Sequence, residues 1–308
     1  MSGTATLQRN AYVGRPVERI EDLRLLRGKG QYVDDLHIEG MLHASVLRSS
    51  VAHGRIRSID VAEARKLPGV HAVIVAADIG RPVPNIPLRL WPLPTLTAYE
   101  QPVIAETKVR YVGEPLAVVV ADSMAVAEDA AGLIEVDIEY LAPVTNTAEA
   151  HAPTALLYEE QGSNCSIVYT AQKGDAEAAF ARAPYKRREQ MSVQRHMAMT
   201  METRGVLAEW NEETGKLRVF GAAKVLFFIR KTVASMLGLD EGDVDHFEND
   251  VGGGFGARGE FFPEDFLIPF ASKFVKRPVK WIEDRREHLL TMSHARERAA
   301  QVRFCSTP

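Results

Sequence analysis

Residues 250–260 are the most constraining stretch of the chain, because four of its glycines fall within five positions around a single phenylalanine, Phe255. Glycine has no Cβ and reaches positive φ at low cost, so successive backbone N–H groups can converge on one anionic group. The stretch follows a predicted strand over residues 244–251 and precedes a predicted helix from Pro263. Such a junction commonly binds a phosphate or pyrophosphate. The alternative is a plain glycine-rich turn with Phe255 in the core.

Composition excludes several other classes of protein. The 308 residues are 46% hydrophobic and 25% charged, which is typical of a globular protein with room for two domains. A net charge of −4 argues against a nucleic-acid partner, and no apolar stretch is long enough to span a membrane. The only cysteines, Cys165 and Cys305, cannot form a four-cysteine cluster site. This cysteine usage is typical of the cytoplasm.

Several motifs surround the glycine stretch in a fixed order. They are residues 40–44 (GMLHA), 108–115 (KVRYVGEP), 250–256 (DVGGGFG), 263–266 (PEDF) and 277–289 (RPVKWIEDRREHL). Together they resemble the molybdopterin-binding large subunit of the xanthine dehydrogenase, aldehyde oxidase and aerobic carbon monoxide dehydrogenase family. The resemblance covers nearly the whole chain in the right order, so it is more specific than any single motif.

The resemblance, together with two series of short alternating helices and strands, predicts an α+β fold. We expect an N-terminal arm at 1–19, an α/β hammerhead domain at 20–143, a linker at 144–163 and a first, truncated molybdopterin-binding domain at 164–308. Each domain is expected to form its own sheet. A single sheet shared across the linker would contradict that division.

The resemblance implies a molybdenum ion held by molybdopterin, with the cofactor bound at the glycine stretch. We expect the cofactor-binding residues to be Gly253, Gly254, Phe255 and Gly256, through backbone amides, and Lys224. The family often has a glutamine at the position of Lys224. A lysine ammonium only donates and is fully charged, so it cannot reproduce an amide. The alternative interpretation of Lys224 is a solvated residue at the start of a helix.

The implied activity is oxidation of an aldehyde, carbon monoxide or a non-purine heterocycle with water-derived oxygen. Purine-oxidising members carry a glutamate at the position of Gly259. Electrons would pass to iron–sulfur and FAD centres on a 2Fe–2S small subunit and an FAD-binding medium subunit. No glutamate here matches the family's general base, so we assign no catalytic residue or metal ligand. We expect another chain to supply the C-terminal half. A truncated, non-catalytic remnant or interaction module is the alternative.

Two irregular segments leave their roles open. Residues 81–101 contain five prolines and form either an exposed connection or a substrate or partner contact, the latter suggested by Trp91. Residues 196–205 contain three methionines, which are more often flexible core filler than ligands. Within them, Glu202 and Arg204 form either a surface ion pair or a structural element near the cofactor.

The last residues predict an unsatisfied strand edge. Residues 299–304 alternate so that Val302 and Phe304 lie on one face, and nothing follows to pair with them. We therefore expect this segment to be poorly ordered or to contact another chain. A strand over 185–193 is expected to continue, after an interruption, into 206–210.

Overall fold

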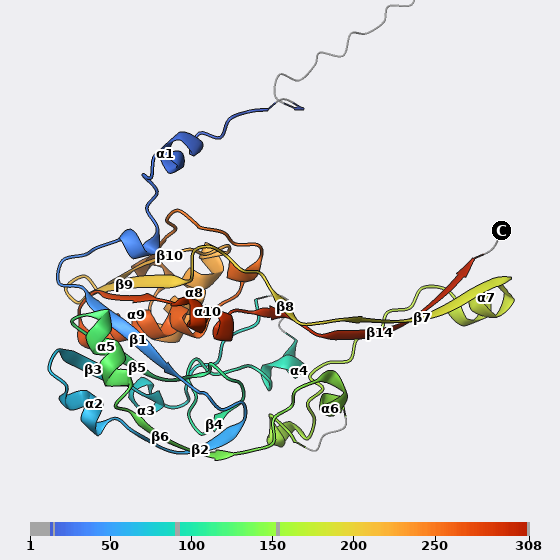
Figure 1. The fold of residues 1–308 in the computed structure, drawn as a ribbon, viewed down its shortest axis with the longest axis horizontal. Helices are drawn as coiled ribbons and strands as arrows, with labels where there is room; N and C mark the ends of the chain where they lie inside the picture. Colours follow the sequence, from blue (N-terminus) through green and yellow to red (C-terminus); the bar gives the residue numbers. More distant parts are fainter. Residues whose placement is uncertain (1–12, 15, 90–92, 152–154, 307–308) are drawn as a thin grey trace, which may run out of the picture.

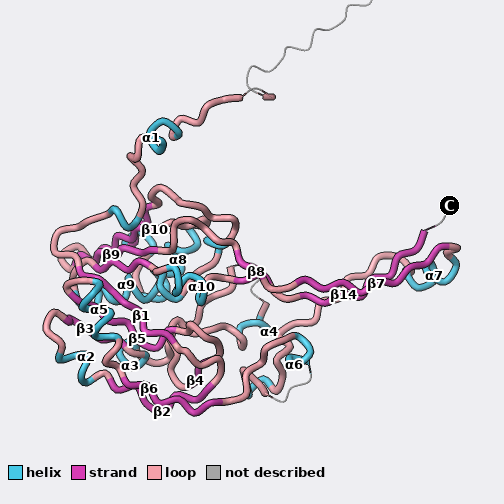
Figure 2. Tube along the Cα trace, in the orientation of Figure 1, coloured by secondary structure: helices cyan, strands magenta, loops and turns pink. Residues whose placement is uncertain are grey.

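The computed structural model describes residues 13–14, 16–89, 93–151 and 155–306, so Trp91 and most of the N-terminal arm lie outside the described residues. The body is built on one mixed sheet of seven strands, in the order β11-β10-β9-β12-β1-β5-β3 (Figures 1 and 2). Its strands are β1 (Leu42–Arg48), β3 (Val70–Ile74), β5 (Pro115–Ala121), β9 (Gly205–Asn211), β10 (Lys216–Gly221), β11 (Val244–Phe247) and β12 (Val279–Ile282).

Strand β5 shows how the core is organised around this sheet. All seven of its residues are buried, because helices cover both faces. Side chains alternate between the two faces of a strand. Val118 and Val120 accordingly join the core cluster beneath α8 (Leu226–Leu237) and α9 (Pro263–Val275). The intervening Ala117 and Val119 join a second cluster formed with α5 (Met124–Ala131) and α2 (Ala62–Lys66).

The seven-stranded sheet joins the two predicted domains. Strand β1 lies before the predicted linker and β12 lies after it, yet they pair in parallel through Leu42 with Val279 and His43 with Lys280. The Lys280 ammonium also donates to the backbone oxygens of Asp34 and Leu36, at 2.8 and 3.1 Å. The expectation that each domain has its own sheet is therefore wrong.

Strands outside the main sheet form smaller units. Strands β4 (Lys108–Val109), β2 (Gly54–Asp60) and β6 (Glu135–Tyr140) make a three-stranded sheet at one side of the body. Strand β8 (His196–Met197) pairs with β13 (His294–Ala295). The remaining described α-helices are α1 (Asp22–Leu26), α3 (Ala76–Ile79), α4 (Pro94–Thr97), α6 (Thr147–His151), α7 (Ala176–Arg182) and α10 (Arg285–Thr291). Within the described ranges, no helix has the length and apolarity that crossing a bilayer requires.

Strands β7 (Tyr185–Val193) and β14 (Arg298–Ser306) form a two-stranded antiparallel ribbon that extends away from the body, with α7 at its tip (Figure 1). Two expectations fail here. The predicted C-terminal edge is paired, because β7 supplies its partner along the whole of β14. In turn, β7 does not continue into β9, which pairs with β10 and β12 in the main sheet.

Helix boundaries follow local sequence signals closely. Helix α5 begins after Ser123, whose hydroxyl accepts a hydrogen bond from the Val126 amide. Helix α8 ends at Gly238, which adopts the left-handed conformation expected of a C-terminal glycine. Helix α9 starts at Pro263, which lacks the N–H that a first helical turn leaves unpaired. The predicted start of a helix at Pro263 is confirmed.

Glu114 predicts a measurable pH dependence of stability. Its side chain is fully buried; Oε2 accepts a hydrogen bond of 2.6 Å from the Arg110 amide, and Oε1 has no partner among the described residues. Burial raises the pKa of Glu114 to about 7. Between the unfolded pKa and that value the folded chain binds more protons than the unfolded chain, so stability falls as pH rises.

The Glu114→Gln variant removes this titration while keeping a similar shape. Its stability advantage over the wild type is expected to grow between pH 5 and pH 8, by roughly 3 kcal/mol at most. Urea unfolding at several pH values measures the difference. Glu139→Gln, at an exposed position on β6, is the control and should show almost no such change. A parallel pH profile for Glu114→Gln and the wild type would mean that Glu114 is charged when folded.

Candidate functional site

The glycine loop, residues 251–259, carries the most unusual backbone of the described chain. Gly253 and Gly256 have φ of 112° and 85°, and Phe255 between them has φ of 46°. A bulky side chain in this left-handed region is strained, and such strain clusters at functional sites. The Phe255 side chain is also 78% exposed. The alternative interpretation, a turn that places Phe255 in the core, is therefore wrong.

Unused hydrogen-bond donors accompany this conformation. The amide N–H groups of Gly253, Gly254, Phe255 and Gly256 donate to no described residue. A Cβ added at Gly254 or Gly256 would meet no described atom within 4 Å, so the space in front of both residues is open. Strand β11 ends at Phe247, earlier than predicted, which leaves the approach to the loop irregular. The loop therefore has backbone donors that are unpaired among the described residues, with open space in front of Gly254 and Gly256.

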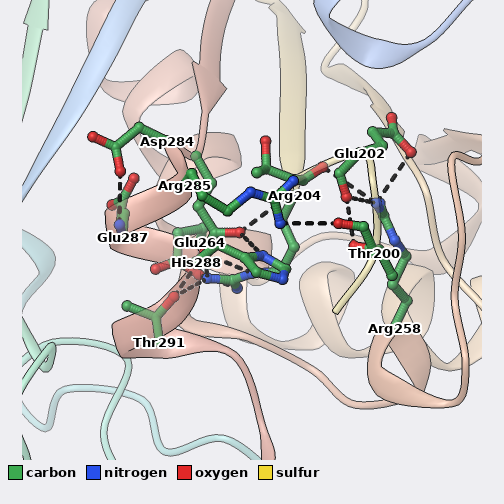
Figure 3. A network of polar contacts seen from close by, with 12 residues as sticks. Thr200, Glu202, Arg204, Arg258, Glu264, Asp284, Arg285, Glu287, His288 and Thr291 are labelled. Atoms are coloured by element: carbon green, nitrogen blue, oxygen red, sulfur yellow. Dashed lines mark hydrogen bonds and ion pairs between the residues drawn. The ribbon is translucent and has the colours of Figure 1, made fainter. Parts of the chain in front are cut away.

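Neighbouring residues hold the loop in this shape (Figure 3). The Glu202 carboxylate accepts a hydrogen bond from the Gly252 amide at 2.7 Å and forms an ion pair with Arg258 at 3.0 Å. Arg258 also donates to the backbone oxygens of Glu202 and Thr203, at 2.7 and 3.2 Å. The Thr200 hydroxyl donates to the Glu202 oxygen. Both ends of the glycine loop are therefore tied to residues 200–203.

Arg204 belongs to a different, buried network, so of the two alternatives for Glu202 and Arg204 the surface ion pair does not form. Its guanidinium donates to Glu264 at 2.7 Å, to Glu283 at 2.6 Å and to Thr291 at 2.8 Å (Figure 3). Glu264 also pairs with Arg48 of β1 at 2.6 Å. The network connects β1, α9 and α10. It is joined through Arg204 to residues 200–203, which hold the glycine loop.

The start of the glycine loop is tied to the N-terminal region. The Asp250 carboxylate accepts two hydrogen bonds of 2.6 Å from the Arg24 guanidinium and one of 2.7 Å from the Gln31 amide. The hydrogen bonds from Arg24, followed by the one from Gln31, lower the pKa of Asp250 to about 2. Sequence patterns did not reveal this contact, because its partners lie 226 residues apart.

Lys224 lies where the sequence placed it, between β10 and α8. Its amide donates to the Arg258 oxygen at 3.1 Å, which fixes its backbone beside the glycine loop. Its side chain is exposed and forms no hydrogen bond or ion pair with a described residue. Sequence reasoning missed Thr200 and Arg258 as supports of the loop, although an arginine two residues after Gly256 was a usable signal.

Phe255→Gly is expected to raise the free energy of unfolding by about 1 kcal/mol, because glycine adopts positive φ without strain. Lys276→Gly is the matched control: Lys276 has φ of 56° at the end of α9, far from the loop along the chain, and should gain similarly. Urea unfolding measures both. Destabilisation by Phe255→Gly would show that the phenyl ring serves packing.

The fold and loop define a class of protein: an α+β protein with a glycine loop that leads into a helix. Residues 27–142 match the aldehyde oxidase and xanthine dehydrogenase, a/b hammerhead domain, and residues 157–307 match the molybdopterin cofactor-binding domain. The chain belongs to the family of molybdopterin-binding large subunits of xanthine dehydrogenases, aldehyde oxidases and carbon monoxide dehydrogenases.

Two curated relatives illustrate the similarity. The chain is 37% identical over 294 residues to the nicotine 6-hydroxylase large subunit of Paenarthrobacter nicotinovorans, covering 96% of this chain and 36% of the relative. It is also 37% identical over 294 residues to the carbon monoxide dehydrogenase large chain of Afipia carboxidovorans, covering 91% and 36%. The chain thus spans little more than a third of the length of these relatives.

Solved structures agree with these relatives. Quinoline 2-oxidoreductase from Pseudomonas putida 86 superposes with a TM-score of 0.83 at 36% identity, over 94% of this chain and 37% of that one. The Cu,Mo-CO dehydrogenase gives a TM-score of 0.84 at 34% identity, over 96% and 38%. The predicted fold class and family are confirmed. None of these named relatives is a non-catalytic module.

Proposed function

We propose that this chain forms one side of the cofactor and substrate site of a molybdenum hydroxylase large subunit. The observation that supports this proposal is the glycine loop, with its free amide groups, its exposed Phe255 and the open space in front of Gly254 and Gly256. Bound molybdopterin and its molybdenum would supply the redox chemistry. Glu202 and Arg258 would hold the backbone N–H groups of the loop in place. These N–H groups could then stabilise negative charge that develops on the ligand without having to rearrange.

The residues proposed to hold the cofactor are those named from the sequence. Gly253, Gly254, Phe255 and Gly256 would donate backbone hydrogen bonds, and the unpaired Lys224 ammonium would face the same space. The exposed Phe255 ring would exclude water from the ligand. The domain limits of 20–143 and 164–308 remain a proposal. The two domains that they define contribute strands to the same sheet.

The proposed substrate is an aldehyde, carbon monoxide or a non-purine heterocycle. Gly259 offers no carboxylate for a purine ring, and the nearest one in sequence, Glu260, lies one residue further along. The assembled enzyme is expected to turn over xanthine far more slowly than its best alternative substrate.

The proposed partners are an FAD-binding medium subunit, a 2Fe–2S small subunit and a polypeptide supplying the remainder of the large subunit. Relatives such as subunit gamma of the 6-hydroxypseudooxynicotine dehydrogenase complex of Paenarthrobacter nicotinovorans are components of assemblies, which supports the need for partners. Cys165 and Cys305 are both exposed and unpaired, in keeping with the reducing cytoplasm as the proposed compartment.

Metal analysis tests the proposed function. The 308-residue chain purified alone is expected to lack molybdenum, because a site contributed by one side only loses most contacts yet must still order the ligand. Co-expression with the remainder of the large subunit should give stoichiometric molybdenum. Molybdenum in the lone chain would contradict the shared site, whereas its absence from a correctly assembled complex would contradict the proposed function.

A further inference from the structure

Two cationic side chains meet beside the glycine loop at Gly259. An ideal Cβ built on Gly259 would lie 3.4 Å from Cδ of Lys224 and 3.9 Å from Nη2 of Arg89. The two residues are far apart in the chain: Lys224 precedes α8, and Arg89 belongs to the proline-rich segment 81–101. Both side chains therefore come within van der Waals distance of the same point beside Gly259.

The donors of these two side chains are largely unused. Lys224 has no ion pair with a described residue, and Nε of Arg89 is buried without a hydrogen-bond partner among them. A guanidinium has five N–H donors, and the only charged partner of Arg89 among the described residues is Glu260, at 3.3 Å. The Glu260 side chain is 52% exposed, so this pair is weak and can be displaced.

We infer that Arg89 and Lys224 form an oxyanion-binding site next to the glycine loop. Both cations lie beside Gly259, and Glu260, paired with Arg89, is the only carboxylate that pairs with either of them among the described residues. An excess positive charge therefore remains, which favours a carboxylate or phosphate group. Either a carboxylate-bearing substrate or the phosphate of the cofactor supplies this chemistry. The inference assigns a role to Arg89 of the segment 81–101. It rests on the proposed function only for the identity of the molecule that carries the anion.

Binding of inorganic phosphate to the isolated chain tests the site without any cofactor. Calorimetric titration at constant ionic strength is expected to show binding that weakens at least tenfold in Arg89→Gln and in Lys224→Gln. Glu260→Gln should strengthen it, because it removes the competing carboxylate. Arg57→Gln, which breaks an exposed pair with Glu139 at 3.7 Å, and Lys231→Gln, on the exposed side of α8, are the controls. The inference fails if the wild type binds no phosphate or if all variants behave like the controls.

The assembled enzyme then identifies the source of the anion. If Arg89→Gln and Lys224→Gln lower the molybdenum content, the anion is the cofactor's phosphate. If the molybdenum content is unchanged and KM rises tenfold for 4-formylbenzoate but not for benzaldehyde, the anion is a substrate carboxylate. No change in either measurement overturns the assignment. Failure of the proposed function looks different, because a complex without molybdenum leaves the phosphate titration intact.

Discussion

Replacing Arg204 with alanine is expected to lower the free energy of unfolding by about 3–5 kcal/mol, because it leaves the buried Glu283 carboxylate without its arginine and Glu264 with Arg48 alone. Glu264 and Glu283 are both almost fully buried and both accept hydrogen bonds from Arg204. The guanidinium also lies 4.1 Å from the centre of the Phe262 ring, so apolar contact is lost as well. Urea unfolding at pH 7 measures the change.

The effect of Arg204→Ala should depend on pH with a defined sign. Burial alone would raise the pKa of Glu264, but the guanidinium groups of Arg204 and Arg48 outweigh it and lower the pKa to about 2. A lowered carboxyl pKa contributes stability above the unfolded pKa, and this stability is lost as pH falls toward the folded value. The difference between wild type and Arg204→Ala should therefore narrow below about pH 4.5.

Two further variants make this prediction specific. Arg204→Lys keeps the charge but loses the planar pair of donors, so it should be destabilised less than Arg204→Ala. Arg218→Ala removes an exposed ion pair with Glu209 between β10 and β9, and should cost less than about 1 kcal/mol. If Arg204→Ala loses as little free energy of unfolding as Arg218→Ala, solvent reaches the buried network. The network would then not support the segment that holds the glycine loop.

Local features of this fold were readable from the sequence because they depend on neighbouring residues. The glycine loop follows from glycine's freedom at positive φ, and the start of α9 follows from Pro263. The exposure of Phe255 was not decided by sequence, since the same pattern allowed a buried ring. Nor did the sequence indicate that Gly252 would be anchored by Glu202, a residue 50 positions away in the chain.

Long-range pairing could not be predicted in the same way. The alternation of residues 299–304 indicated a strand, but period two is the same for every strand and does not specify a partner. Likewise, the apolar run of β1 gave no sign that β12 would pair with it and merge two domains into one sheet. Arg204 was visible as a charged residue, whereas its burial depends on Glu264 and Glu283, 60 and 79 residues further along.

The β7–β14 ribbon has two unlike faces. Residues directly opposite each other in an antiparallel pair share a face. One face carries most of the apolar side chains, Tyr185, Met191, Val193, Ala300, Val302 and Phe304, together with Arg187, Glu189, Arg298 and Ser306. The other face carries Lys186, Arg188 and Arg303, whose charged groups lie over the Phe180 ring of α7. Helix α7 thus contacts only the basic face near the tip, and apolar side chains such as Met191 and Phe304 are 50% and 47% exposed.

In the isolated chain, amides of β14 are expected to exchange with solvent rapidly, because a two-stranded ribbon without a covering layer is marginally stable. Co-expression with the polypeptide proposed to complete the large subunit should cover the apolar face. Exchange at residues 301–304 should then slow by about 100-fold, the factor expected for a partner at 100 times its dissociation constant. Hydrogen exchange followed by mass spectrometry measures this, with the buried strand β5 as the internal reference.

Matched lysine substitutions on the two faces identify the surface responsible. Val302→Lys places a charge on the apolar face and should abolish the protection by the partner. Gln301→Lys changes the neighbouring position on the opposite face and should leave the protection in place. Rapid exchange in both the presence and the absence of the partner would show that the ribbon is a free extension. If the partner buries the apolar side chains, only Val302→Lys should abolish the protection from exchange. Equal loss of protection in the two lysine variants would show that the partner binds through charge.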